Sequence, residues 1–243
     1  MDLVQLTPEL TFLRFPVGHV YLWRDPDGLT LIDSGAPGAA EMIAEAIRRL
    51  GHRPADVRRL VLTHGHVDHA GGAAEIASWG EVTVLAHRAE APVLRGERLQ
   101  PPPNLADWER PIFERANAQL PAATAAPVRV DRELDDGDVI DFGGGARVVA
   151  VPGHTDGSIA LYLPGPRVLF TGDLAARDPA DPDPDTPVML GVFNLDTAQA
   201  AASFKRLATL EAEIACFGHG EPVTAGAAAR LQATAERLPD PAP

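Results

Sequence analysis

Apolar and polar residues alternate in short runs over the first part of the chain, a pattern that predicts β-strands. Such runs occupy residues 3–6, 10–15, 20–23 and 29–32, and residues 24–28 (Arg-Asp-Pro-Asp-Gly) are typical of a turn. Because these runs follow one another closely, we expect an antiparallel meander.

The pattern then changes to helical spacing. Met42, Ile43, Ala46, Ile47 and Leu50 recur at intervals of three and four, which predicts a helix over residues 39–50 that is ended by the glycine that follows. Apolar runs at residues 58–62 and 81–86 predict two further strands, and a helix between them is expected to reach about residue 79.

Residues 88–127 differ from their surroundings because prolines interrupt them repeatedly. They contain two short stretches of helical character, near residues 88–95 and 107–119. A long excursion of this kind often covers a binding site. We interpret it as a lid or substrate wall, with an ordinary surface insertion as the alternative.

Strands return in the second half of the chain, at residues 128–130, 139–142, 147–151, 159–163, 168–171 and 213–217. Helices are expected over residues 198–210 and 225–238, and residues 175–187 form an acidic, proline-stiffened loop. We expect residues 239–243 to fray. No linker divides the sequence, so we predict a single domain over residues 1–243.

Composition narrows the classes of partner. Hydrophobic residues make up 45% of the 243 residues, but no apolar run approaches the roughly 18 residues that span a bilayer. The first residues show no secretory signal, so we expect a cytoplasmic protein. A net charge of −13 repels phosphate backbones and anionic membranes. We therefore expect a small-molecule substrate, and neither nucleic acid nor a membrane as partner.

The sequence contains one cysteine, Cys216. A single cysteine excludes an internal disulfide and any metal site built from several cysteines of one chain. Cys216 stands in an apolar run, so we interpret it as a buried strand residue without catalytic function.

Residues 63–69, Thr-His-Gly-His-Val-Asp-His, follow a predicted strand and precede a predicted helix. His64 and His66 are two positions apart, so in an extended segment they point to the same side and can share one ion. Asp68 and His69 come after the chain has begun to turn, so they can face a second ion. This layout predicts two neighbouring metal sites that share a bridging water.

Three more candidate ligands follow predicted strands. His154, Asp173 and His219 each come after an apolar run and beside a glycine, which lets the backbone approach an ion closely. Each alone is more typical of a turn residue, but together they complete a dinuclear site.

These motifs, in this order, resemble the metallo-β-lactamase superfamily of metallohydrolases. The resemblance rests on residues 31–35 (Leu-Ile-Asp-Ser-Gly), 63–69, 152–155 (Pro-Gly-His-Thr), 171–173 (Thr-Gly-Asp) and 218–220 (Gly-His-Gly). It implies an α/β fold, a four-layer αββα sandwich with the site at one edge of the paired sheets.

The resemblance also implies a role for each ligand. His64, His66 and His154 would hold the first metal, Asp68, His69 and His219 the second, and Asp173 would bridge both. Asp33 would support the metal-binding loops without binding metal itself. The implied cofactor is a pair of zinc ions, with iron or manganese left open.

Comparison with the branches of the superfamily makes several of their activities less favoured for this chain. The flavodiiron branch has an acidic residue where this chain has His66, which disfavours redox chemistry. The β-lactamase branches lack a bridging aspartate where Asp173 stands, and the homoserine-lactone lactonases have a tyrosine at the position of Ala176. Glyoxalase II enzymes grip glutathione through a basic C-terminal region, whereas Lys205 is the only lysine here.

We therefore expect a dinuclear zinc hydrolase that cleaves a small carboxylic ester, thioester or lactone through a metal-bridging hydroxide. Asp68 is the catalytic candidate because it can orient the nucleophile or shuttle its proton. His19, Tyr21 and His87 are pocket candidates, although a structural role is more typical of each.

Alternative functions remain open within the same fold. They are a mononuclear iron persulfide dioxygenase, a β-lactam-hydrolysing enzyme and a non-catalytic protein that binds a small ligand. We expect the pocket walls to come from residues 88–127 and 175–195, where no motif names a substrate. A homodimer is also left open, because proline-rich excursions can pack between subunits.

Overall fold

The computed structural model describes all residues except 123, 179–180, 182, 184 and 240–243. The chain forms two compact units. Unit 1 comprises Met1–Gln100 and Arg115–Leu134, and unit 2 comprises Pro101–Glu114 and Asp135–Pro243. Most of the predicted fraying terminus, and three prolines of the acidic loop (Pro179, Pro182 and Pro184), lie outside the described residues.

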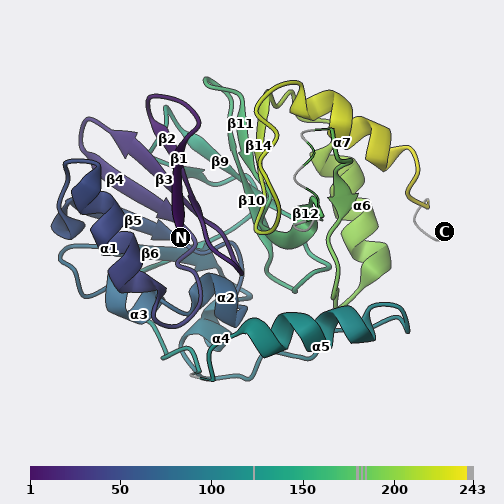
Figure 1. The fold of residues 1–243 in the computed structure, drawn as a ribbon, viewed down its shortest axis with the longest axis horizontal. Helices are drawn as coiled ribbons and strands as arrows, with labels where there is room; N and C mark the ends of the chain where they lie inside the picture. The colour runs from purple at the N-terminus through teal and green to yellow at the C-terminus, as the bar shows by residue number, and fades with distance from the viewer. Residues whose placement is uncertain (123, 179–180, 182, 184, 240–243) are drawn as a thin grey trace. The chain divides into compact units, whose positions relative to one another are not determined.

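Unit 1 is built on a seven-stranded sheet in which the strands follow sequence order (Figure 1). The strands are β1 (Asp2–Gln5), β2 (Leu10–Arg14), β3 (Val20–Asp25), β4 (Gly28–Ile32), β5 (Val57–Val61), β6 (Thr83–His87) and β7 (Arg132–Leu134). Strands β1 to β4 pair antiparallel, so the predicted meander is confirmed. Strands β4 to β7 pair in parallel, which brings their carboxyl ends to one edge.

Helices of unit 1 cover a face of this sheet. They are α1 (Ala39–Arg49), α2 (Val67–Ala70), α3 (Ala73–Ile76) and α4 (Ala91–Leu94), with a 3₁₀ turn η1 at Pro54–Asp56. Leu29 and Leu31 share one face of β4 and belong to the same buried cluster as Ile43 and Ile47 of α1. Burial of this apolar stripe is what holds α1 on the sheet.

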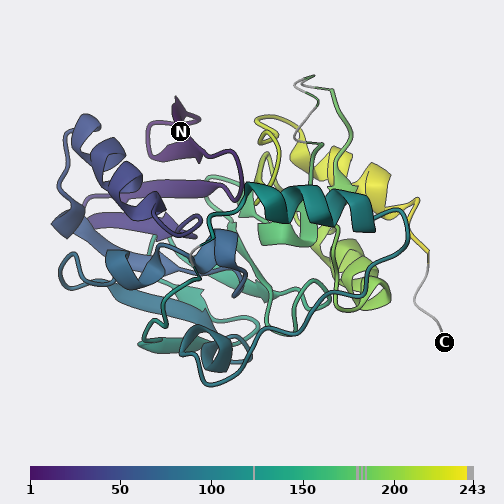
Figure 2. The same cartoon turned by 60° about the horizontal axis from the view of Figure 1, so that its bottom comes forward.

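Unit 2 contains a five-stranded sheet in the order β14, β11, β10, β9, β8. The bounds are β8 (Val139–Ile140), β9 (Ala146–Ala150), β10 (Ile159–Leu163), β11 (Val168–Phe170) and β14 (Ile214–Cys216), with a separate pair of β12 (Ala175–Ala176) and β13 (Met189–Leu190). Helices α6 (Thr197–Leu207) and α7 (Ala227–Ala235) lie side by side in this unit (Figure 2). Phe204 and Leu231 bring them into one buried cluster with Leu169 of β11.

Two sequence predictions are wrong in detail. Residues 128–130 are not a strand, and β7 begins at Arg132. The Val128 N–H instead donates to the Leu94 carbonyl (2.8 Å), which lies at the C-terminal end of α4. The helix expected to continue to residue 79 is broken into α2 and α3. Between the two helices, the Gly72 N–H donates to the Gly35 carbonyl (3.3 Å), and a Cβ on Gly71 would come within 2.3 Å of the Pro37 nitrogen, so the segment around Gly35 and Pro37 packs against this junction.

The proline-rich segment, residues 88–127, contains α4 and α5 (Arg110–Gln119), so its predicted helical stretches are confirmed. It begins in unit 1, supplies Pro101–Glu114 to unit 2 and returns to unit 1. Its function as a lid stays a prediction, as do the single domain, the cytoplasmic location and the homodimer. Within the described part of the chain, no helix combines the length and apolarity that crossing a membrane requires.

Candidate metal centre

His64, His66, Asp68 and His69 form a cluster at the carboxyl end of β5, which we call the histidine half-site. His64 Nε2 and His66 Nδ1 lie 3.0 Å apart, and their rings cross at 84°. Two imidazole nitrogens on one tetrahedral zinc ion lie about 3.3 Å apart, given Zn–N distances of 2.0–2.1 Å. The pair therefore fits a shared metal ion after a small outward movement.

Asp68 and His69 occupy the single turn of α2. His66 precedes this helix, and its carbonyl accepts the N–H groups of His69 (3.0 Å) and Ala70 (2.8 Å). His69 Nε2 lies 3.6 Å from an Asp68 carboxylate oxygen. The change from extended chain to helix at His66 is thus what directs these two side chains toward one another.

Asp33 fixes the orientation of the histidine rings in this half-site. Its Oδ1 accepts the Thr63 N–H (2.7 Å), and its Oδ2 accepts the Thr63 hydroxyl (2.8 Å) and lies 2.9 Å from His69 Nδ1. The Thr63 hydroxyl lies 3.0 Å from His64 Nδ1. Because Nδ1 of both histidines is engaged, Nε2 is the atom each offers to a metal.

The backbone of Asp33 has a φ of +62°, a conformation that a non-glycine residue rarely adopts. The loop that contains it is fixed by Ser34, whose N–H and hydroxyl both donate to the His69 carbonyl (2.7 Å each). These contacts agree with the supporting role that the resemblance implied for Asp33.

His154, Asp173 and His219 form a second cluster, in unit 2, which we call the carboxylate half-site. Asp173 Oδ2 lies 3.5 Å from His154 Nε2 and 3.2 Å from His219 Nε2. The His154 side chain is 2% exposed and that of His219 is 31% exposed. One carboxylate oxygen thus stands between two imidazole nitrogens, which is a donor set suited to zinc or another divalent transition metal.

Residues 191–195 brace two of these ligands. The Leu195 N–H donates to the His154 carbonyl (3.2 Å), and the Gly191 N–H donates to the Leu174 carbonyl (2.9 Å). A Cβ on Gly191 would stand 1.7 Å from the Asp173 carbonyl oxygen. Only a glycine allows this approach.

Sequence reasoning missed Arg177, which supports His219. Its N–H donates to the His219 carbonyl (3.3 Å). Its guanidinium, in a residue only 3% exposed, donates to the carbonyls of Thr186 (3.1 Å), Glu221 (3.3 Å) and Asp183. Burial lowers the pKa of the Arg177 guanidinium. A lone arginine at the start of an acidic segment was the sequence signal for this role.

The other sequence candidates take part in local packing. His19 is buried with its ring edge against Phe12, and Tyr21 stacks on the same ring at 5.2 Å. His87 Nδ1 accepts the Ala89 N–H (3.2 Å). Cys216 is buried, and burial raises the pKa of its thiol, in agreement with the interpretation as an inert strand residue.

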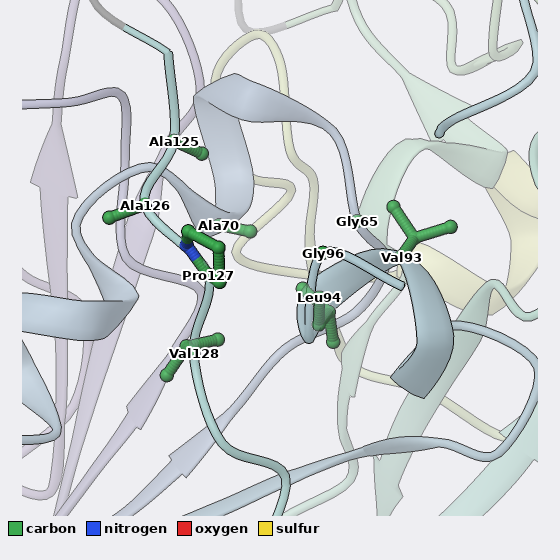
Figure 3. Close-up of a pocket in the computed structure, with 9 residues that line it drawn as sticks. All are labelled: Gly65, Ala70, Val93, Leu94, Gly96, Ala125, Ala126, Pro127 and Val128. Atoms are coloured by element: carbon green, nitrogen blue, oxygen red, sulfur yellow. The ribbon is translucent and has the colours of Figure 1, made fainter. Parts of the chain in front are cut away.

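A small cavity of about 70 Å³ lies in unit 1 beside Gly65 (Figure 3). Its lining is mainly aliphatic and comprises Gly65, Ala70, Val93, Leu94, Gly96, Ala125, Ala126, Pro127 and Val128. It is bounded by α4 on one side and by residues 125–128 on the other, so the proline-rich segment packs behind the histidine half-site.

The sequence model described as the metallo-beta-lactamase superfamily matches residues 13–219 of the chain. The chain belongs to this superfamily. It is 31% identical over 229 residues to the probable metallo-hydrolase YflN of Bacillus subtilis, a match that covers 87% of this chain and 84% of YflN.

Two further relatives match over part of their length. The chain is 30% identical to a hydroxyacylglutathione hydrolase of Aeromonas hydrophila, across 84% of this chain and 61% of that enzyme. It is 38% identical to the acyl-coenzyme A thioesterase MBLAC2 of Gallus gallus, across 47% of this chain and 40% of that protein.

Solved structures agree with the fold. The Rm3 metallo-beta-lactamase aligns with a TM-score of 0.69 and 25% identity, over 90% of this chain and 78% of its own. A metallo-beta-lactamase from Cronobacter sakazakii aligns with a TM-score of 0.68 and 25% identity, again over 90% of this chain and 78% of its own. The predicted fold of the metallo-β-lactamase type is confirmed, and the chain is a metallo-hydrolase family member with clustered His and Asp ligand groups.

Proposed function

We propose that this chain is a dinuclear zinc hydrolase that cleaves a small carboxylic thioester, ester or lactone. The observation that carries the proposal is the arrangement of both half-sites, in which imidazole nitrogens and carboxylate oxygens already face one another. Structural zinc sites are closed by four protein ligands, whereas seven ligands across two ions leave positions open for water and substrate.

The two half-sites together would supply one centre. We assign His64, His66 and His154 to the first metal, Asp68, His69 and His219 to the second, and Asp173 to a bridge between them. Five imidazoles and two carboxylates favour zinc, and the same donors accept iron or manganese.

A bound pair of zinc ions would supply a hydroxide nucleophile at neutral pH and polarise the substrate carbonyl. The chain's own residues then have separate tasks. The Asp68 carboxylate, beside His69 Nε2, accepts a proton from the nucleophile and can return it to the leaving group. Asp33 holds His69 directly, and His64 through the Thr63 hydroxyl, in the orientation that this chemistry needs.

A thioester is the substrate class to test first. Two of the relatives are named for thioester hydrolysis, one on hydroxyacylglutathione and one on acyl-coenzyme A. This chain has a single lysine, Lys205, which favours a thioester other than that of glutathione. Esters, lactones and a β-lactam complete the substrate panel.

The test combines metal analysis with activity. We expect two zinc equivalents per chain by mass spectrometry, and hydrolysis of at least one thioester, ester or lactone. His66→Ala and Asp173→Ala should each lose metal and lower kcat/KM by about a thousandfold, a loss of about 4 kcal/mol of transition-state stabilisation. His52→Ala, which changes a histidine outside both half-sites, is the matched control.

Other outcomes point to the alternatives. Hydrolysis that persists in both variants would contradict the proposal. One iron equivalent with oxygen uptake on a persulfide would select the dioxygenase. A β-lactam cleaved in preference to the other substrates would select antibiotic hydrolysis, and bound metal without turnover of any substrate would select a binding protein.

A further inference from the structure

The two ring nitrogens of His66 have different neighbours. His66 Nδ1 faces His64 Nε2 at 3.0 Å, and His66 Nε2 faces the side-chain nitrogen of Gln100 at 3.5 Å. Gln100 lies in the proline-rich segment, whose contribution to the site the sequence left open. Its side-chain oxygen Oε1 is buried and accepts no hydrogen bond among the described residues.

This arrangement conflicts with the protonation state that a metal requires. If His66 binds metal through Nδ1, the neutral ring carries its proton on Nε2 and becomes a hydrogen-bond donor there. The nitrogen of the Gln100 amide is also a donor. A half-turn of the amide exchanges its nitrogen and oxygen at little steric cost, and it would place the acceptor Oε1 opposite His66 Nε2.

A second observation favours the same half-turn. The Glu90 carboxylate, in a residue only 1% exposed, accepts the Gly65 N–H at 2.7 Å. A Cβ on Gly65 would stand 2.7 Å from Glu90 Oε2 and 3.5 Å from Gln100 Oε1, so two acceptor oxygens lie over one face of this glycine. After the half-turn, the NH₂ group of Gln100 would take the place of its Oε1 on the side that faces the Glu90 carboxylate. A donor would then face that carboxylate in place of a second acceptor.

We propose that Gln100 is a positioning residue for the metal ligand His66. Its carbonyl oxygen accepts the Nε2–H of His66 and so fixes Nδ1 as the nitrogen that binds metal. Outer partners of this kind hold the ring orientation and tautomer of a metal-binding histidine. The inference rests on the proposed function. It also means that the proline-rich segment supports the metal site through Gln100.

The test compares three variants by titrating the metal-free chain with Zn²⁺ against a chromophoric chelator. Gln100→Met removes the acceptor at similar size and should weaken zinc binding by about 10–100-fold. Gln100→Glu retains an acceptor oxygen for His66 but places a second carboxylate near Glu90, so it should bind zinc more tightly than Gln100→Met and recover the affinity only in part. Gln232→Met changes an exposed glutamine on α7 and should leave the Kd unchanged.

The second readout is the NMR signal of the His66 ring nitrogens in the zinc-loaded chain, which a general loss of stability would not alter. In the unmodified chain we expect the proton of His66 to be on Nε2. The chemical shift of this Nε2–H should change in Gln100→Met. If Gln100→Met fails to fold, Gln100→Glu decides the question. A carboxylate is a stronger acceptor than an amide oxygen, so it should shift the Nε2–H signal downfield, and a signal at the unmodified position overturns the inference.

The outcomes separate the two proposals. If the unmodified chain binds two zinc ions and hydrolyses a substrate, but Gln100→Met retains both the Kd and the Nε2–H signal, only the role of Gln100 is overturned. If the unmodified chain binds no stoichiometric zinc, both proposals fail.

Discussion

Asp33 is the residue on which the histidine half-site depends most. Its two oxygens reach Thr63 and His69, and Thr63 in turn reaches His64. A carboxylate can accept all of these bonds, whereas the amide of asparagine has only one acceptor oxygen. The geometry of two proposed metal ligands therefore depends on the two acceptor oxygens of one buried side chain.

We expect Asp33→Asn to lower metal affinity about 10–100-fold, as loss of an outer partner does in other metal sites. Zinc titration against a competing chelator measures this change. Asp27→Asn, at an exposed carboxylate paired with Arg59, is the control and should bind zinc normally. Unchanged affinity in Asp33→Asn would show that Asp33 does not set the ligand geometry.

Arg177 supports the carboxylate half-site by donating hydrogen bonds to backbone carbonyls, whereas Asp33 contacts a ligand side chain. Arg177→Met removes the donor to the carbonyl of Thr186, which is buried, and to that of Glu221, which is half-buried. Each unsatisfied buried group costs about 1–3 kcal/mol, so we expect a loss of roughly 3 kcal/mol in the free energy of unfolding. Urea denaturation measures it, with the exposed Arg237→Met as control, which should change the unfolding free energy by less than about 0.5 kcal/mol.

At the scale of elements, short segments between regular elements do most of the positioning. The residues after β13 brace His154 and Asp173 at the same time, and they do so because Gly191 permits backbone-to-backbone contact. The sequence predicted walls for residues 175–195, but it contained no signal that Gly191 and Leu195 also hold ligands in place. Contacts of this kind join positions far apart in the chain.

Gly191→Ala should therefore displace Asp173. Its Cβ would stand 1.7 Å from the Asp173 carbonyl oxygen, which requires the backbone to shift. We expect lower zinc stoichiometry and a loss of activity of at least tenfold, since even small misplacements of reacting groups reduce rates strongly. Gly165→Ala is the matched control, because its Cβ would meet nothing within 4 Å. Equal zinc content in the two variants would contradict this bracing role.

At the scale of the whole molecule, metal binding should be coupled to folding. An ion that binds only the folded chain stabilises it by about 4 kcal/mol when its free concentration is 1,000 times Kd. We expect chelation of the metal to lower Tm by several degrees, reversibly on return of zinc. Differential scanning calorimetry measures the shift, and a His154→Ala chain, with a weakened site, should respond less to the chelator. A Tm that does not respond to chelation in the unmodified chain would contradict stabilisation by bound metal.

Much of the architecture followed from local patterns. Alternation of apolar residues predicted the meander β1 to β4, and helical spacing predicted α1 and α6. These predictions succeeded because strand and helix periodicities reflect burial of one face, which is a local property of the sequence. The predicted strand at residues 128–130 failed because Val128 pairs with the end of α4, a contact that no local pattern records.

The sequence by itself determined the family, the order of the motifs and the residue types offered to a metal, because ligand chemistry belongs to side chains and their spacing. The tertiary structure alone decided which atoms face one another and what holds them. Asp33, Arg177, Gly191 and Gln100 acquire their roles from partners outside their own local segment, such as His69 for Asp33 and His219 for Arg177. Hydrogen bonds and close approaches between distant segments depend on how the chain folds back on itself, so no one-dimensional spacing specifies them.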